Sequence, residues 1–245
     1  MEMDETIRAR LDDTRKQLFE HFDAITSSGY SVSVFTRWGE AADQVWVKSR
    51  VTEESETSSD EFFGARAATK QTHPIVGLDP IHCTQQLGVP GPWSERLSHF
   101  RMGFTPSSGA EIQSEYIVPR SQAVSAIGAV LRLGSKIRPL IQVSEIRTIA
   151  ADRLWMSPQY GQDTVAIHFT WKPEQQRLKR VLEELERELA QFEARPHWGK
   201  LFLADAKTIG PMYERLGDFA ALLDRLDPRG TFRNQWLESR VLGGA

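Results

Sequence analysis

Residues 140–149 read LIQVSEIRTI, and residues 164–171 read TVAIHFTW. Both runs are rich in β-branched and aromatic residues, which is the composition of strands. A further strand is predicted for residues 111–119, which read EIQSEYIVP, and a hairpin for residues 31–38 and 43–48, which four residues connect. Together these runs predict a sheet in which neighbouring strands are mainly antiparallel.

Amphipathic helices are predicted before, between and after these strands. Apolar residues recur near every 3.6 positions in residues 5–26, and again after Ser121, the expected N-cap of a helix that ends at Gly134. Pro173 begins the most strongly patterned helix, and a last helix is expected at residues 212–226. The three apolar stripes are Ile7, Leu11, Leu18, Phe22 and Ile25; Val124, Ile127 and Leu131; and Leu178, Val181, Leu182, Leu185, Leu189 and Phe192.

The order of the predicted elements is α-β-β-loop-β-α-β-β-α-α. Hairpin-joined strands with helices long enough to lie over one sheet face predict an α+β fold, a mainly antiparallel sheet covered on one face by helices. An acidic run at residues 52–59 begins a polar excursion that reaches about Pro74, and glycine and proline punctuate residues 88–93. Excursions of this length often cover a site. No linker divides the chain convincingly, so residues 1–245 are predicted as one domain.

Composition and charge exclude several classes of protein. With 245 residues, 40% of them hydrophobic, the chain is neither disordered nor collagen-like. The 30 basic and 33 acidic residues nearly balance, so the broad basic surface that nucleic acid or an anionic membrane requires is missing. The sequence also contains no P-loop, dinucleotide GxGxxG, GxSxG or HExxH motif. A self-contained nucleotide-dependent enzyme or a common serine hydrolase would normally show one of them.

The single cysteine and the N-terminus bear on the compartment. Cys83 has no partner for an intramolecular disulfide or a cysteine-rich metal site, and is expected as a small buried apolar residue rather than a nucleophile. The first residues carry no signal-peptide pattern, and no run approaches the length of a membrane span. We therefore expect a cytoplasmic protein without a metal site or a membrane span.

Polar side chains on two neighbouring strands form the candidate site. A period of two places Glu145 and Arg147 on one face of their strand, and His168 and Thr170 on one face of the next. Antiparallel pairing would merge these four residues into one polar patch. The run ARPHWGK at residues 194–200 adds Lys200 after an aromatic pair.

A purely structural interpretation of the same residues stays open. Glu145 and Arg147 can be an ion pair on a solvated sheet face, with His168 a satisfied histidine, because structural ion pairs also cluster charges. The His197-Trp198 pair can be a packing corner, and residues 232–234 a C-terminal clip.

Longer ordered runs resemble a known family. The chain resembles the C-terminal half of the alditol (xylitol) oxidases, in the sugar-lactone oxidase branch of the vanillyl-alcohol oxidase flavoproteins. The runs that carry the resemblance are SEIRTIAADRLWMSP at 144–158, residues 165–171, ARPHWGK at 194–200 and DPRGTFRN at 227–234, with residues 19–38 and GVPGPW at 88–93 upstream.

The resemblance implies an FAD enzyme that oxidises a terminal hydroxyl of a polyol to an aldehyde and reduces O2 to H2O2. In that family a separate N-terminal domain holds FAD through a covalent histidine link, and the C-terminal half binds substrate. The glycine-rich flavin loop and the linked histidine have no counterpart in residues 1–245. The chain is therefore expected to be a substrate-binding cap domain, which lacks the FAD-binding domain and has no oxidase activity and retains no FAD on its own.

By the same resemblance, Glu145, Arg147, Thr170 and Lys200 correspond to the polyol pocket. Arg147 and Lys200 are candidates to stabilise developing alkoxide and reduced-flavin charge, and His168 is a candidate base; which residue takes the proton stays open. The implied partners are a polyol such as xylitol or sorbitol and the missing FAD-binding domain. A cap without that domain is also expected to expose an apolar patch and to self-associate. Two alternatives stay open: a stand-alone polyol-binding module, and a structural or interaction domain without redox activity.

Overall fold

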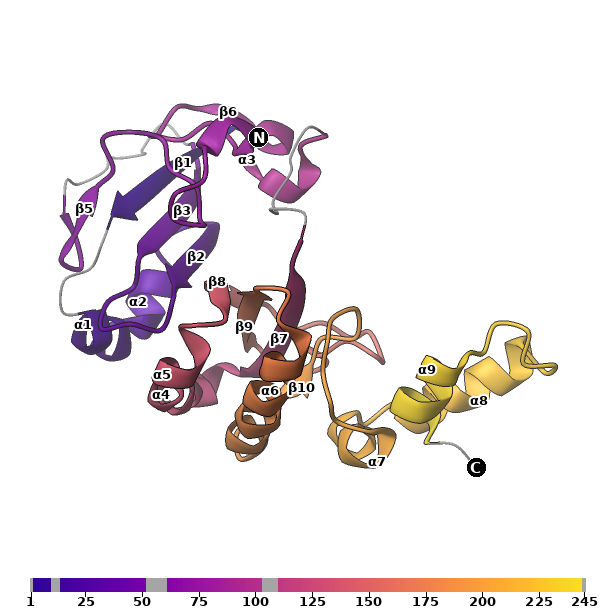
Figure 1. The fold of residues 1–245 in the computed structure, drawn as a ribbon. Helices are drawn as coiled ribbons and strands as arrows, with labels where there is room; N and C mark the ends of the chain where they lie inside the picture. The colour runs from indigo at the N-terminus through magenta and orange to yellow at the C-terminus, as the bar shows by residue number, and fades with distance from the viewer. Residues whose placement is uncertain (1, 10–13, 52–60, 103–109, 244–245) are drawn as a thin grey trace.

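The strands of the protein form one antiparallel sheet. A computed structural model describes residues 2–9, 14–51, 61–102 and 110–243 (Figure 1). The strand order is β10-β7-β9-β8-β2-β3-β1-β5-β4, with β6 paired to β1. The described strands are β1 (Glu2–Ala9), β2 (Ser31–Thr36), β3 (Gln44–Arg50), β4 (Glu61–Phe62), β5 (Ala65–Ala67), β6 (Gly91–Pro92), β7 (Ile112–Pro119), β8 (Ile141–Ile149), β9 (Thr164–Trp171) and β10 (Arg195–Pro196).

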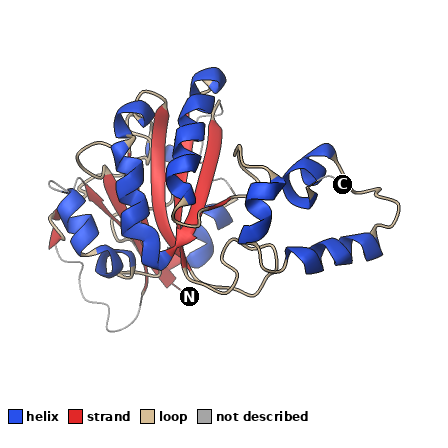
Figure 2. Cartoon of the chain, turned by 90° about the horizontal axis from the view of Figure 1, so that it is seen from below, coloured by secondary structure: helices blue, strands red, loops and turns tan. Residues whose placement is uncertain are grey.

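Helices cover one face of this sheet, which confirms the α+β fold (Figure 2). The two longest helices of that layer, α4 and α6, pack against each other over the central strands, whereas α8 and α9 lie beside the sheet rather than on it (Figures 1 and 2). The described α-helices are α1 (Thr14–Glu20), α2 (Phe22–Thr26), α3 (Trp93–Arg96), α4 (Ala123–Arg132), α5 (Gly134–Ile137), α6 (Gln175–Ala190), α7 (Ala206–Ile209), α8 (Leu216–Leu226) and α9 (Gln235–Leu237). Shorter helical turns are Pro80–His82, Ser98–Phe100, Arg120–Gln122, Gly210–Met212 and Glu238–Leu242.

The main core lies between the sheet and α6. Phe169 and Trp171 of β9 stack with ring centroids 5.0 Å apart, and the Trp171 indole N–H donates to Ser114 Oγ at 2.8 Å. The predicted stripe of α6 is confirmed: five of its six residues are fully packed, and Phe192 lies partly buried just beyond the helix end. Side chains on the opposite face of β8 and β9 are therefore free to form a site.

The N-terminal helix prediction is wrong for residues 5–9. Residues 2–9 form β1, which pairs with β3 over seven residues, and the first described helix begins at Thr14. Without β1, the outer edge of β3 would have unpaired backbone groups, and pairing with them outweighs a local helical pattern of apolar residues. Residues 14–26 do form helices, α1 and α2.

Three helix boundaries also differ from the prediction. Ser121 is not an N-cap, because a 3₁₀ turn at Arg120–Gln122 precedes α4. Gly134 does not end a helix but begins α5, where a Cβ would lie 2.6 Å from the Trp38 carbonyl oxygen, so only glycine fits this approach. The last helix begins at Leu216 instead of residue 212 because a turn containing Pro211 comes first.

The buried face of α4 is rotated from the predicted one. Ile127 is buried as expected, but Val124 and Leu131 are only partly buried. The face that contacts the core is Ala123, Ala126, Ile127, Ala129 and Val130. Small alanines let the helix approach the sheet closely, which a pattern of large apolar residues cannot reveal.

The remaining strand predictions are confirmed. β2 and β3 form the expected hairpin, and β7, β8 and β9 are antiparallel neighbours. The acidic run at residues 52–59 lies outside the described residues. The described helices are too short or too polar to cross a lipid bilayer.

Candidate active site

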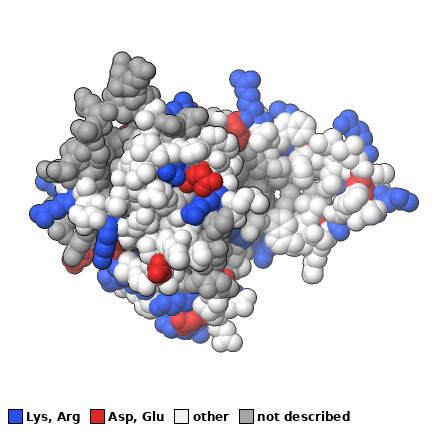
Figure 3. Space-filling view, turned by 90° about the horizontal axis from the view of Figure 1, so that it is seen from above, with Lys and Arg blue, Asp and Glu red and all other residues white. Residues whose placement is uncertain are grey.

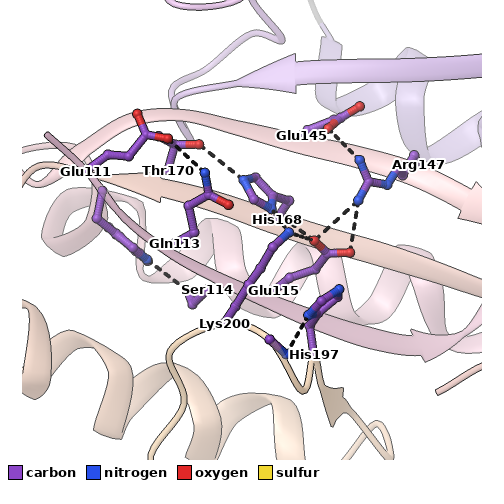
Figure 4. Close-up of polar contacts among 12 residues, drawn as sticks. Glu111, Gln113, Ser114, Glu115, Glu145, Arg147, His168, Thr170, His197 and Lys200 are labelled. Atoms are coloured by element: carbon purple, nitrogen blue, oxygen red, sulfur yellow. Dashed lines mark hydrogen bonds and ion pairs between the residues drawn. The ribbon is translucent and has the colours of Figure 1, made fainter. Parts of the chain in front are cut away.

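The strand registers bring polar residues into one row across the sheet. His168 of β9 lies opposite Glu145 of β8 on one side and opposite Glu115 of β7 on the other. Thr170 lies two residues along β9, opposite Gln113. Residues in one row point to the same face, and Figure 4 shows these side chains on one side of the strands, with helices on the other.

Lys200 reaches this row because its loop follows β7. The His197 N–H donates to the Glu115 carbonyl at 2.9 Å, and the Leu201 N–H donates to the Gln113 carbonyl at 2.9 Å. These two backbone hydrogen bonds enclose Lys200 and hold it against the strand. Its ammonium consequently contacts the Glu115 carboxylate.

The five predicted residues meet through a sixth, Glu115 (Figure 4). The contacts are Arg147 Nη1 to Glu145 Oε2 (2.8 Å), Arg147 Nη2 to Glu115 Oε1 (3.1 Å), His168 Nδ1 to Glu115 Oε2 (3.0 Å), His168 Nε2 to Thr170 Oγ1 (3.2 Å), Lys200 Nζ to His168 Nδ1 (2.8 Å) and Lys200 Nζ to Glu115 Oε2. A single buried carboxylate thus contacts a guanidinium, an imidazole and an ammonium group.

All of these side chains except that of Glu115 line a cavity of about 230 Å³. Its polar part contains all five predicted residues, Lys48 of β3, and Glu111 and Gln113, and its apolar wall contains Phe35, Trp46 and Val143. The excursion between β5 and β7 closes part of the cavity with the residues His73, Pro74, Ile75, Cys83 and Ser98. Of the excursion predicted from residue 52 to about Pro74, the structure places His73 and Pro74 at the cavity.

The wall of the cavity contains two residues that could be misread as reactive. Cys83 is 7% exposed and packs with Phe35, Trp46 and Val143, which confirms it as a small buried residue. His73 accepts a hydrogen bond from the Ile75 N–H through Nδ1, and burial lowers its pKa. His73 is therefore uncharged at neutral pH.

Charge pairing keeps both carboxylates of the row ionised. Burial by itself raises the pKa of Glu115, but the hydrogen bond from His168 and the charges of Arg147 and Lys200 outweigh it and hold that pKa well below its usual range. Burial likewise acts to raise the pKa of Glu145, and Arg147 with the Ser33 hydrogen bond lowers it overall. The charge of Glu145 in turn raises the pKa of Arg147.

Stability should fall in acid because of these shifts. Folding lowers the pKa of Glu115 below its ordinary value of 4.5, so the contribution is complete above that pH and is lost as pH falls below it. We expect the stability difference between the parent and Glu115→Gln, measured by urea unfolding, to be large at pH 7 and clearly smaller at pH 3. An equal difference at both pH values would contradict the assigned charge state.

Glu115 is the residue that the sequence analysis missed. The strand reads EIQSEYI from residue 111, so Glu111, Gln113 and Glu115 alternate with apolar or small residues and share a face. The period of two that indicated Glu145 and Arg147 was a sufficient signal here too. Lys48 and His73 had no such signal, because long-range packing brings them to the cavity.

Two other parts of the resemblance have packing roles in this structure. Trp198 donates through its indole N–H to the Met156 carbonyl at 2.8 Å and stacks near Tyr213, so it forms a packing corner. In the turn at residues 227–234, the Asp227 carboxylate accepts the N–H groups of Thr231 and Phe232. This turn connects α8 and α9. These two helices, with the residues up to Leu242, form an arm beside the sheet, called here the C-terminal arm, and the turn lies at its far end, away from the cavity (Figures 1 and 2).

Comparison with known proteins identifies the family. The sequence pattern of the D-arabinono-1,4-lactone oxidase family matches residues 108–240, which is more than half of the chain and includes every residue of the row. The chain belongs to the D-arabinono-1,4-lactone oxidase family. The family is one of FAD-linked oxidoreductases, which confirms the resemblance seen in the sequence.

Individual relatives cover different shares of the chain. The alditol oxidase of Streptomyces sp. (strain IKD472 / FERM P-14339) is 47% identical over 223 residues, 91% of this chain and 53% of that enzyme. The L-gulono-1,4-lactone dehydrogenase of Mycobacterium tuberculosis is 34% identical over 134 residues, 54% of this chain and 30% of the relative. The L-gulonolactone oxidase of Mus musculus is 26% identical over 151 residues, which are 59% of this chain and 34% of the relative. The chain therefore spans about half the length of the first relative and about a third of the other two.

Proposed function

We propose that this chain is the substrate domain of an FAD-dependent alditol oxidase and binds a polyol such as xylitol or sorbitol in the cavity. The observation that carries the proposal is the convergence of Glu145, Arg147, His168, Thr170 and Lys200 on that cavity. The 47% identity to an alditol oxidase favours a polyol over a sugar lactone.

The donor and acceptor set suits a row of hydroxyl groups. A carboxylate accepts from a hydroxyl, and a guanidinium or ammonium donates to it, so Glu145 and Arg147 together fix the orientation of a polyol. Thr170 adds a hydroxyl that both donates and accepts. The apolar wall at Phe35 and Trp46 suits the C–H faces of the carbon chain.

FAD, when bound, supplies the acceptor for the two electrons that leave the carbinol carbon, and O2 carries them away as H2O2. Arg147 and Lys200 carry positive charge, so they are suited to lie beside the negatively charged reduced flavin. The binding of FAD itself is assigned to a flavin-binding domain. Within the cavity, His168 accepts the hydroxyl proton, and Arg147 and Lys200 stabilise the alkoxide charge as it develops.

Isothermal titration of the purified chain with xylitol and sorbitol tests binding. We expect heat from both polyols, none from 1-pentanol, and a colourless preparation that releases no H2O2 from xylitol. Absence of polyol binding would favour a structural or interaction domain.

A chimera tests the redox role. The chain joined to the flavin-binding half of the Streptomyces alditol oxidase should oxidise xylitol with release of H2O2. Binding by the chain without oxidation by a flavin-loaded chimera would favour a stand-alone polyol-binding module.

The surface next to the cavity is consistent with a covering domain. Of the 13 exposed large apolar side chains among the described residues, eight lie in the segment 76–102, including Trp93 and Phe100. Figure 3, which views the molecule from the side of β6 and α3, shows mainly uncharged surface on this face, with one cluster of acidic and basic side chains near its middle. We propose that the flavin-binding domain covers it.

The uncovered chain should therefore self-associate. Sedimentation of the chain alone should show concentration-dependent oligomers, and the double variant Ile81→Ser/Phe100→Ser should reduce them because it removes exposed apolar area. Leu226→Ser/Phe232→Ser, at the far end of the C-terminal arm, is the matched control. A parent chain that stays monomeric at high concentration would contradict this.

A further inference from the structure

We propose that Glu115 is a positioning residue for the oxidation: it accepts the Nδ1–H of His168 and thereby presents Nε2 as a proton acceptor to the cavity. This inference rests on the proposed function, because it assigns the residue that makes His168 a base. Glu115 is not itself a catalytic residue, since it does not line the cavity.

Burial makes Glu115 a fixed acceptor. Its side chain is 2% exposed, and it lies beneath the three groups that reach the cavity, Arg147, His168 and Lys200. Arg147 Nη2 donates to both carboxylate oxygens, to Oε1 at 3.1 Å and to Oε2 at 3.3 Å, and Oε2 also contacts His168 and Lys200. The carboxylate therefore has little freedom to turn.

The position of this oxygen decides which ring nitrogen carries the proton. An ionised carboxylate only accepts hydrogen bonds. If Nδ1 were bare, its lone pair would face Glu115 Oε2 at 3.0 Å inside the protein, which is repulsive. A proton on Nδ1 turns the same contact into a charge-assisted hydrogen bond. In the neutral ring Nε2 is then bare and accepts from the Thr170 hydroxyl, 3.2 Å away.

Lys200 offers the competing arrangement. Its Nζ lies 2.8 Å from Nδ1 and could donate to a bare Nδ1, which would place the ring proton on Nε2 and remove the base. Lys200 and Glu115 differ in conformational freedom. The lysine side chain is long and its ammonium has three rotatable protons, whereas the Glu115 carboxylate is held in place by Arg147. Lys200 can turn its protons to Glu115 and the cavity, so the carboxylate determines the tautomer.

The same carboxylate assists the proton transfer itself. When His168 takes the hydroxyl proton it becomes a cation beside Arg147 and Lys200, an unfavourable place for a third positive charge. The negative charge of Glu115, in contact with all three groups, stabilises that cation. Glu145, opposite His168 on β8, adds a second negative charge, but its ion pair is with Arg147.

Long-range ¹H–¹⁵N NMR of the histidine rings in this chain tests the tautomer directly. At pH 9, far above the usual titration range of histidine, His168 of the parent should show a protonated Nδ1 and a bare Nε2. In Glu115→Gln the preference should shift toward the form protonated at Nε2, because Lys200 becomes the dominant partner of Nδ1. A parent ring protonated at Nε2 overturns the proposal.

Glu186→Gln is the matched control. Glu186 belongs to α6, and its carboxylate lies against the helix-covered face of β7, where it accepts the Tyr116 hydroxyl at 2.8 Å and the Leu203 N–H at 2.7 Å. This variant alters a partly buried carboxylate near the same strand that accepts hydrogen bonds from three neutral donors, those of Tyr116, Leu203 and Ala204. It therefore tests whether the loss of any nearby carboxylate is enough to move the His168 signals. We expect the His168 signals of this variant to match the parent. If both variants shift them equally, Glu115 has only a structural role.

Kinetics of the chimera supply the second measurement. Glu115→Gln should lower kcat for xylitol about 10- to 100-fold, the loss of one charge-assisted hydrogen bond, with KM within about 3-fold of the parent. Glu115→Asp, which restores the charge, should recover part of kcat, and Glu186→Gln should keep it. An unchanged kcat in Glu115→Gln overturns the positioning role. A parent chimera that oxidises no polyol contradicts the proposed function instead, and does not affect the NMR result on the tautomer.

Discussion

Replacing Lys200 by alanine is expected to slow xylitol oxidation by the chimera about 100-fold or more. The ammonium lies in the cavity, within reach of both His168 and Glu115, and its charge acts on the alkoxide that develops only in the transition state. Loss of such a donor lowers kcat rather than binding. Stopped-flow measurement of flavin reduction by xylitol isolates this step from the reaction with O2.

Two further variants separate charge from size. Lys200→Met keeps the length of the side chain without its charge and should be as slow as Lys200→Ala. Lys207→Ala removes an exposed lysine on α7 and should react at the parent rate. Circular dichroism of the chain alone should show the parent fold in all three. Thermal unfolding should occur at a lower temperature in the two Lys200 variants, because they remove one cationic partner of the buried Glu115 carboxylate. If Lys200→Ala oxidises xylitol at the rate of the parent, Lys200 serves only as a counter-ion of Glu115.

Arg147→Lys is expected to lower kcat about 10- to 100-fold although it keeps the charge. The guanidinium contacts Glu145 with one nitrogen and Glu115 with another, so it bridges two carboxylates that an ammonium cannot reach in the same geometry. The lost charge-assisted hydrogen bond corresponds to about 1.5–3 kcal/mol. Steady-state kinetics should show a change in kcat/KM that comes mainly from kcat.

Arg37→Lys provides the comparison. Arg37 also donates through two nitrogens to a carboxylate, that of Asp43, but the pair lies exposed on the hairpin. We expect the Arg37 variant to oxidise xylitol as the parent does, because exposed pairs contribute little. If Arg147→Lys behaves like Arg37→Lys, the row across β7, β8 and β9 is a structural ion-pair network.

Local pattern predicted the central strands and their polar face. The alternation in residues 141–149 and 164–171 placed Glu145, Arg147, His168 and Thr170 on one face, and the structure brings all four to one cavity. The prediction succeeds because a strand has a period of two whatever its surroundings. The α6 stripe was predictable for the same kind of reason, since a helix repeats every 3.6 residues.

Contacts between distant segments were not predictable in this way. β1 has a helix-like spacing of apolar residues but pairs with β3, about 40 positions along the chain. α4 begins after a 3₁₀ turn, and its buried face uses small residues that fit the sheet. In each case the structure of the segment depends on the surface against which it packs. That surface is formed by residues far away in the sequence, so a short stretch of sequence does not reveal it.

The sequence by itself determined the α+β composition, the central strands and which side chains share a strand face, because backbone periodicity needs no partner. Only the tertiary structure decided that the loop after β10 follows β7 and brings Lys200 to the row, and that Glu115 lies beneath it. Those contacts depend on strand register and on backbone hydrogen bonds between segments about 85 residues apart. A buried carboxylate is stable here only because the fold brings its three partners, two cations and an imidazole, into contact with it. Burying any one of these groups without the others would remove it from water with no compensating interaction, which is unfavourable.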